Sequence, residues 1–207
     1  IERMLLRRAD VSRRWDAFFA QSWKFAESAN VSQNYAYFDL RVGPLYPAEA
    51  LITREAIYDY LSDFPRQVQA GFQSAELLRS PLGALLVRRM NVQRYLNIGE
   101  LGIVHYVEPY YGITYSGETK NILDLWQTTV PILKMLKLSG ALIEYAKASC
   151  ELRIEAHLGN ISGQSFYSGP NPVMSLPIGT VAPSVSASAQ VSSTNILGSA
   201  LEVAVDL

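Results

Sequence analysis

The sequence predicts an α+β fold, in which a mostly antiparallel sheet is covered by a long, proline-kinked helix and an amphipathic helix stands at the N-terminus. Several segments alternate apolar and polar residues with the period of two that half-buried strands show. Two longer segments repeat apolar residues at helical spacing. The elements follow one another as helix, strand, helix, two strands, long helix and three strands, without the regular alternation of a parallel sheet. We therefore expect antiparallel pairing, with helices packed on the sheet.

Length and composition indicate an ordinary globular protein. The chain has 207 residues, 49% hydrophobic and 18% charged, which is enough apolar material to fold without disulfides or metals. The net charge of -1 argues against a dedicated nucleic-acid binder, whose domain is usually basic. A single cysteine, Cys150, excludes an intrachain disulfide and indicates a reducing, cytoplasmic location. Residues 122–143 are too interrupted by charge and proline to span a membrane, so we expect no membrane partner.

Residues 2–29 predict a long amphipathic helix. Its apolar residues have a/d spacing with Arg8 and Ser22 as polar interruptions, and they are Met4, Val11, Trp15, Phe18 and Phe25. Because the chain begins at Ile1 rather than Met, we interpret residues 1–30 as a connector from an upstream segment, docked at its aromatic end on a single α+β domain of residues 31–207. The first half of the helix holds most of its arginines, namely Arg3, Arg7, Arg8, Arg13 and Arg14. A solvated helix face is the simpler interpretation of these arginines, and contact with nucleic-acid phosphates is the alternative.

The next segments predict a strand and a short helix. Residues 35–42 place Phe38, Leu40 and Val42 on one face and Asp39 and Arg41 on the other. Thr53 is a suitable N-cap for a helix over residues 54–63. The mixed stretch of residues 67–83 indicates a turn of helix around residues 74–78.

The clearest supersecondary pattern is a hairpin in the middle of the chain. Residues 85–98 and 103–111 both have strand patterns, and they flank a connection bracketed by Gly99 and Gly102. On the first strand Arg94 interrupts an inward apolar set that includes Leu96 and Ile98. On the second strand, alternation sends His105 and Glu108 to opposite faces, which argues against joint acid–base catalysis.

The last third predicts the covering helix and three further strands. Residues 121–148 have a helical apolar stripe, and Pro131 should kink or divide that helix. A strand over residues 152–158 follows, and then a loop rich in Gly, Ser, Asn and Pro over residues 159–183. Two segments with small side chains, residues 185–191 and 200–205, predict the final strands.

Two constellations are candidate sites. The first is a small-molecule pocket at the strand ends, to which aromatic, histidine and arginine side chains would contribute: Arg41, Arg89, Arg94, His105, Tyr110 and Tyr111. Its alternative is ordinary coverage of a sheet edge by β-favouring tyrosines. The second is the face of residues 151–157, where Glu151, Glu155 and His157 would suit a metal. Its alternative is a solvent-facing strand, which the absence of any HxH or HExxH motif favours.

The middle and end of the chain resemble the C-terminal region of bacterial proteins that carry an N-terminal Schlafen-type, AlbA-like domain. The resemblance lies in the strand and turn of residues 38–47, the hairpin of residues 95–104, and the long helix followed by residues 152–158. In such proteins the N-terminal domain is thought to engage nucleic acid or nucleotide. The resemblance implies an accessory module and carries over no functional residue.

The sequence contains no phosphate-binding glycine loop and no nucleophile elbow, so we expect no cofactor and no catalytic residues. The leading hypothesis is a non-catalytic sensory, regulatory or assembly module of a larger bacterial protein. Its partners would be a second copy, through the aromatic half of the first helix, an upstream domain of the same chain, or a small molecule. The alternatives are a metal-dependent hydrolase or nuclease on the Glu151, Glu155 and His157 face, and a nucleic-acid-binding module.

Overall fold

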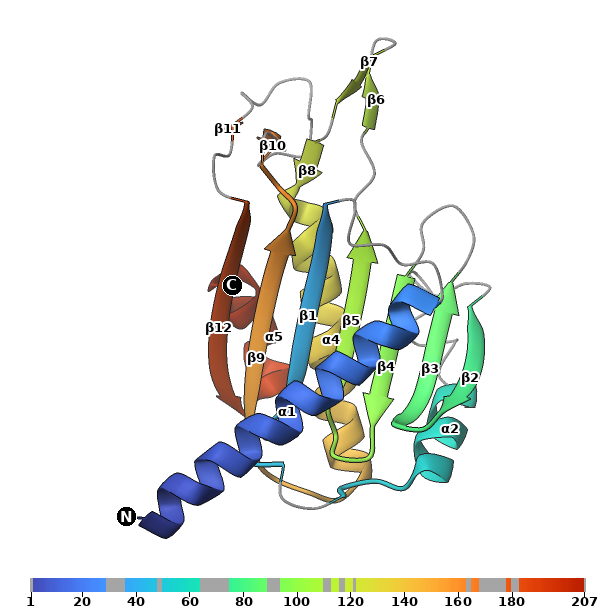
Figure 1. The fold of residues 1–207 in the computed structure, drawn as a ribbon, viewed down its shortest axis with the longest axis vertical. Helices are drawn as coiled ribbons and strands as arrows, with labels where there is room; N and C mark the ends of the chain where they lie inside the picture. The colour runs from blue at the N-terminus through green and yellow to red at the C-terminus, as the bar shows by residue number, and fades with distance from the viewer. Residues whose placement is uncertain are drawn as a thin grey trace.

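A computed structural model describes residues 2–28, 36–47, 50–63, 75–88, 94–109, 113–115, 118–120, 122–162, 165–167, 178–179 and 183–206. Its centre is a sheet of seven strands, every neighbouring pair of which is antiparallel (Figure 1). In spatial order the strands are β12 (Ser184–Ser192), β9 (Glu151–Gly159), β1 (Tyr37–Pro44), β5 (Val104–Pro109), β4 (Arg94–Gly99), β3 (Gly83–Arg88) and β2 (Glu76–Ser80). This arrangement confirms the predicted α+β fold with a mostly antiparallel sheet.

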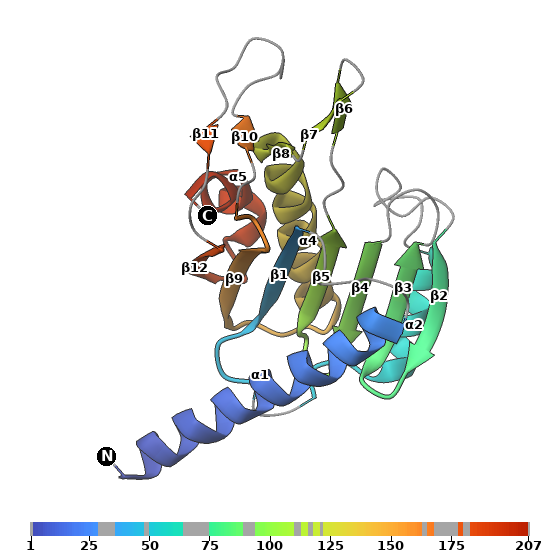
Figure 2. The ribbon, with the colours of Figure 1, turned by 45° about the horizontal axis from the view of Figure 1, so that its top comes forward.

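Helices cover both faces of this sheet. Figures 1 and 2 show α1 (Glu2–Ser28) running obliquely across one face, with its N-terminal end projecting beyond the sheet. On the opposite face lie α2 (Arg54–Asp63), α4 (Leu125–Tyr145) and α5 (Ile196–Asp206). Among the described helices, none has both the length and the apolar composition required to cross a membrane.

Five short strands lie at one end of the molecule, beyond the main sheet (Figure 2). Strands β6 (Ile113–Tyr115) and β7 (Glu118–Lys120) form an antiparallel pair. Strand β10 (Ser165–Tyr167) pairs in parallel with β8 (Ile122–Asp124) and antiparallel with β11 (Ile178–Gly179).

The main core lies between the sheet and the three helices behind it. The apolar residues predicted for one face of β1, Phe38, Leu40 and Val42, are all buried there. They pack in one cluster with residues of α4 such as Met135 and Leu136. The predicted cap of α2 is also present, since the amide of Ala56 donates to Thr53 Oγ1 at 3.2 Å.

The β4–β5 hairpin is confirmed, but its first strand is shorter than predicted. Residues 85–98 do not form one strand, because they divide between β3 and β4, which pair with each other. The five residues between these two strands contain no glycine or proline, so the sequence gives no turn signal. The predicted connection is correct: Gly102 has φ 73°, a conformation that glycine adopts without strain, and its amide donates to the Gly99 carbonyl.

Three further predictions are wrong in detail. The helical turn expected around residues 74–78 is the edge strand β2. The covering helix begins at Leu125 instead of residue 121, because residues 122–124 form β8, and Pro131 does not divide it into two helices. The final strand expected at residues 200–205 is α5, whose inward residues Ile196, Ala200 and Val203 are spaced by four and three as a helix requires.

Candidate functional site

The face of the sheet beneath α1 carries a row of polar residues. Strand pairing places Arg41 of β1 directly opposite His105 of β5 on one side and Glu155 of β9 on the other. Directly opposed residues of antiparallel strands project from the same face. Asp39, two residues before Arg41, therefore joins this face as well.

Helix α1 docks on this face through its aromatic residues. Trp15, Phe18 and Phe19 are all nearly inaccessible to solvent and cluster with Ile103 at the β4–β5 turn. The indole nitrogen of Trp15 donates to the carbonyl of Pro44 at 3.2 Å. These three side chains are therefore buried within the chain itself, against the sheet.

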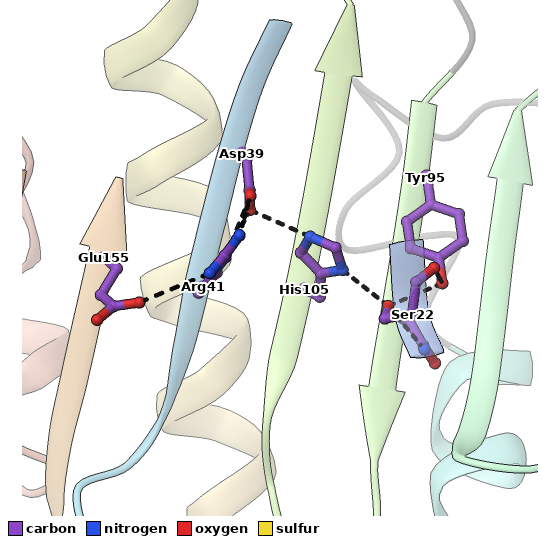
Figure 3. Close-up of polar contacts among 7 residues, drawn as sticks. Ser22, Asp39, Arg41, Tyr95, His105 and Glu155 are labelled. Carbon is purple, nitrogen blue, oxygen red and sulfur yellow. Dashed lines mark hydrogen bonds and ion pairs between the residues drawn. The ribbon is translucent and has the colours of Figure 1, made fainter. Parts of the chain in front are cut away.

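A continuous chain of polar contacts passes from α1 across the sheet (Figure 3). Ser22 Oγ lies 2.7 Å from His105 Nδ1, and His105 Nε2 lies 3.1 Å from Asp39 Oδ1. Asp39 accepts hydrogen bonds from Arg41 Nε and Nη2, the latter at 2.6 Å. The remaining Arg41 nitrogen, Nη1, lies 4.0 Å from Glu155. The chain therefore joins one helix to three neighbouring strands.

Ser22 also bonds to β4. Its Oγ lies 2.8 Å from the hydroxyl of Tyr95 and accepts from Asn97 Nδ2 at 3.0 Å. The Tyr95 hydroxyl donates to the main-chain carbonyl of Ser22 at 2.7 Å. Burial raises the pKa of Tyr95, so the hydroxyl keeps its proton and remains a donor.

Asp39 is ionised inside the protein. Its side chain is only 1% exposed, and this burial by itself would raise the carboxyl pKa. The charge and hydrogen bond of His105, together with those of Arg41, outweigh burial and lower the pKa of Asp39 to about 2. An ionised carboxylate only accepts hydrogen bonds, so the facing His105 Nε2 carries a hydrogen.

Ser22, His105 and Asp39 have the connectivity of a serine hydrolase triad, yet they are enclosed. The exposed fractions of the three side chains are 0%, 0% and 1%. The rings of Phe19, Trp23 and Tyr95 lie edge-on to the imidazole, with centroid distances of 5.2 to 5.7 Å. The serine is enclosed in this arrangement, and the three side chains connect α1 to the sheet.

A groove opens where the enclosed chain reaches the surface. It has a volume of about 580 Å³ and lies between Trp23 of α1 and the strands β1, β9 and β12. Its lining comprises Trp23, Tyr37, Asp39, Arg41, Glu155, Ala156, His157, Ser186, Ala187 and Ser188. The lining therefore combines an aromatic wall with a guanidinium, two carboxylates, an imidazole and two serine hydroxyls.

The structure joins only part of the predicted ligand cluster. Arg41 and His105 are connected through Asp39, on the α1 face. Arg94 lies on the other face of the sheet, where its Nη2 pairs with Glu108 at 2.7 Å and the Tyr106 hydroxyl donates to the same carboxylate. Arg94 therefore does not share a pocket with Arg41, because strand alternation sends the two side chains to opposite sides. Arg89, Tyr110 and Tyr111 lie outside the described residues.

The Glu151, Glu155 and His157 face is occupied by other contacts. Glu155 pairs with Arg153 and Arg41, and His157 Nδ1 bonds to Ser186 Oγ at 2.7 Å. Within the part of the chain that the structure describes, no three His, Cys, Asp or Glu side chains are grouped as metal ligands. This face instead forms one wall of the groove.

The arginines of α1 are only partly described. Arg13 is exposed, and Arg14 pairs with Asp10 at 3.2 Å and donates to the carbonyl of Pro47. The side chains of Arg3, Arg7 and Arg8 lie outside the described part of the structure. The structure therefore describes the side chains of only two of these five arginines, Arg13 and Arg14.

Two residues of this site, Ser22 and Asp39, stand out in the sequence, although their role in the site does not. Ser22 stood out as a polar residue in an apolar a/d stripe, which is the signal of a buried hydrogen bond. Alternation places Asp39 on the face of β1 opposite its apolar residues. Covering that face with α1 turned these positions, with Tyr95, into a buried network.

Comparison of the chain with protein-family models, with curated proteins and with solved structures finds no match in any of the three.

Proposed function

We propose that this chain is a non-catalytic regulatory module in which a small polar ligand in the groove controls how firmly α1 docks on the sheet. The observation that carries the proposal is shared use of the same side chains. Asp39 and Arg41 line the groove, and they also belong to the polar chain that ends on Ser22 of α1. Trp23 lines the groove from α1 itself.

The groove suits a small ligand with several polar groups. Its volume of about 580 Å³ lies within the range of small-molecule pockets, roughly 300–1,000 Å³. Arg41 Nη1 is 4.0 Å from Glu155, so this nitrogen is held less closely than the two that bind Asp39 and can turn to a ligand. His157 and the hydroxyls of Ser186 and Ser188 offer further hydrogen bonds on the opposite wall.

Occupation of the groove couples to α1 by mass action. A ligand that binds the docked form stabilises it relative to every form in which α1 has left the sheet. The coupling requires that the ligand contact α1 or a residue of the polar chain that ends on Ser22. Trp23 belongs to α1, and Asp39 and Arg41 belong to that polar chain. An upstream segment attached to α1 would then sense the ligand through the position of the helix.

The proposal is tested by thermal unfolding in the presence of a panel of sugars, amino acids, carboxylic acids and nucleosides. A true ligand at a hundredfold excess over its Kd adds about 2.7 kcal/mol, and we expect Tm to rise by roughly 5–10 °C. The same compound should slow amide hydrogen exchange in residues 15–28. If no compound in the panel raises Tm, or if a binder leaves exchange in α1 unchanged, the regulatory proposal is wrong.

Two tryptophan substitutions on one strand provide the matched control. Ser188→Trp places a large ring on the groove wall and should abolish the ligand-induced rise in Tm. Ser184→Trp lies on the same face of β12, outside the groove lining, and should leave that rise unchanged. Both serines are exposed, so neither substitution overfills the core.

A further inference from the structure

Strand β12 is one edge of the seven-stranded sheet. It pairs with β9 on its inner side, and no other described strand pairs with its outer side (Figure 1). An edge strand presents a row of main-chain N–H and C=O groups to any further strand. With nine residues, β12 offers a longer row than most strands of globular proteins.

The two edges of the sheet differ in how they are protected. Strand β2, at the opposite edge, has five residues, of which Glu76 and Arg79 are charged and exposed. Short length and charged side chains are the usual means of blocking an edge against pairing. Strand β12 has the sequence SVSASAQVS, which contains no charged residue and no proline. Among the residues that the structure describes, the β2 edge is thus protected against pairing and the β12 edge is not.

The side chains of β12 match a second copy of the same strand. Residues 184, 186, 188 and 190 on the groove face are polar, and residues 185, 187, 189 and 191 on the face toward the core are apolar. A two-fold axis perpendicular to the sheet pairs the strand antiparallel with itself and keeps each face on its own side. Polar residues then meet polar residues and apolar residues meet apolar ones. Small serine and alanine side chains allow this approach, and the uncharged edge introduces no repulsion.

We propose that two copies of this chain associate through β12 and form one continuous antiparallel sheet. The interface also has a consequence for the groove, since Ser186 and Ser188 line it and belong to β12. The two grooves of the dimer lie side by side across the two-fold axis. This inference does not depend on the regulatory proposal, because it rests on the edge strand alone.

Sedimentation equilibrium of the whole chain tests the dimer. The expected mass is twice 23.0 kDa. Val185 is 50% exposed on the apolar side of β12, and Val185→Lys should raise the dimer dissociation constant at least about tenfold, because the ammonium group must lose water against the partner strand. Val130→Lys adds the same charge at a 43% exposed valine of α4, and it should leave the dimer intact.

Cysteine cross-linking locates the axis without relying on the lysine variant. In a Cys150→Ser background, a single cysteine is placed in turn at residues 186 to 190. Each two-fold antiparallel pair has one residue that faces its own copy, so efficient disulfide cross-linking is expected at one position and not at its neighbours. A chain that stays monomeric up to hundreds of micromolar would refute the interface. A dimer that persists in Val185→Lys and cross-links at none of the five positions would refute it as well. A thermal-shift response in a monomeric chain would separate that outcome from failure of the regulatory proposal.

Discussion

Ser22 is the residue on which the contacts between α1 and the sheet converge. Its side-chain oxygen contacts His105, Tyr95 and Asn97, three groups that are all buried. A buried polar group that loses its partner costs about 1–3 kcal/mol, whereas a bond that is kept contributes less. Ser22 therefore contributes to stability mainly because it gives these buried groups a hydrogen-bond partner.

Replacing Ser22 by alanine should lower the free energy of unfolding by about 2–3 kcal/mol, because the substitution leaves His105 Nδ1 and Asn97 Nδ2 without this partner. Urea denaturation measures the loss. Ser139→Ala is the matched control, since Ser139 is equally buried but its Oγ has no hydrogen-bond partner among the described residues. The control should change stability by less than about 0.5 kcal/mol or increase it. Equal effects of the two substitutions would contradict the role of the network.

Asp39 predicts an acid-dependent loss of stability. Its pKa is about 2 in the folded protein, against an ordinary value of 3.8. Between these values the unfolded chain binds the proton and the folded chain does not, so stability falls as pH falls. The contribution is fully present above about pH 4 and is lost through pH 2, with a size of about 2 kcal/mol.

The measurement is urea denaturation between pH 2 and pH 5. Asp39→Asn should reduce stability at pH 5 and flatten the dependence on pH relative to the unmodified chain. Asp59→Asn, at an exposed position of α2, should leave the slope unchanged. An unchanged slope in Asp39→Asn would show that Asp39 is not ionised in the folded state.

Individual site residues could be placed from the sequence, but their environment could not. Alternation put Asp39 and Arg41 together on one face of β1, as the structure confirms. It also separated His105 from Glu108, which the hairpin confirms. The polar face is buried because α1 crosses the sheet. The alternation within a strand does not show that a helix far away in the sequence covers one of its faces, so this burial could not be predicted.

At the scale of elements, α1 depends on a close approach to β4. A Cβ atom added at Gly99 would lie 2.4 Å from Cε2 of Phe18, which is closer than packed carbon atoms can come. Phe18 cannot easily move aside, since it packs edge-on against Phe19 with a centroid distance of 5.3 Å. A glycine at position 99 is therefore needed for α1 to pack this closely against β4.

Gly99→Ala should cost about 1–3 kcal/mol and speed amide exchange in residues 15–28, because α1 must shift to relieve the overlap. Adding Phe18→Leu should recover part of the loss, and this double-mutant cycle isolates the contact. Gly198→Ala is the control, since nothing lies within 4 Å of its added Cβ in α5. The control should stabilise the chain by about 0.8–1 kcal/mol. A Gly99→Ala variant as stable as the unmodified chain would contradict the close packing of Phe18 on Gly99.

The elements that the sequence predicted correctly have a strong period or a local signal. Strands β1 and β9 alternate over most of their length, and α2 has a cap at Thr53. The elements that were predicted wrongly lack such a period or signal. The residues between β3 and β4 include no glycine or proline, and the small residues of α5 fit either period until its packing against α4 is known.

At the scale of the whole molecule, α1 is one of three layers, with the sheet between it and the other helices. The division into a connector of residues 1–30 and a domain of residues 31–207 treats the sheet as complete without it. Yet α1 covers the enclosed polar network and buries Trp15, Phe18 and Phe19. Burial of an aromatic or large aliphatic side chain contributes about 1.5–3 kcal/mol, so three of them approach the total stability of a typical domain, about 5–15 kcal/mol.

A chain without residues 1–28 should therefore lose cooperative unfolding and bind the hydrophobic dye ANS. The expected cause is exposure of apolar surface around Ile103, together with loss of the Ser22 partner of His105, Tyr95 and Asn97. A synthetic peptide of residues 10–28 should restore a sharp thermal transition when added to the shortened chain, and the same peptide with Trp15→Ala should not. If the shortened chain melts sharply at the temperature of the full chain without binding ANS, residues 31–207 form an independent domain. In that outcome α1 would form one wall of the groove without stabilising the fold. Regulation through α1 docking would then need another source of coupling energy.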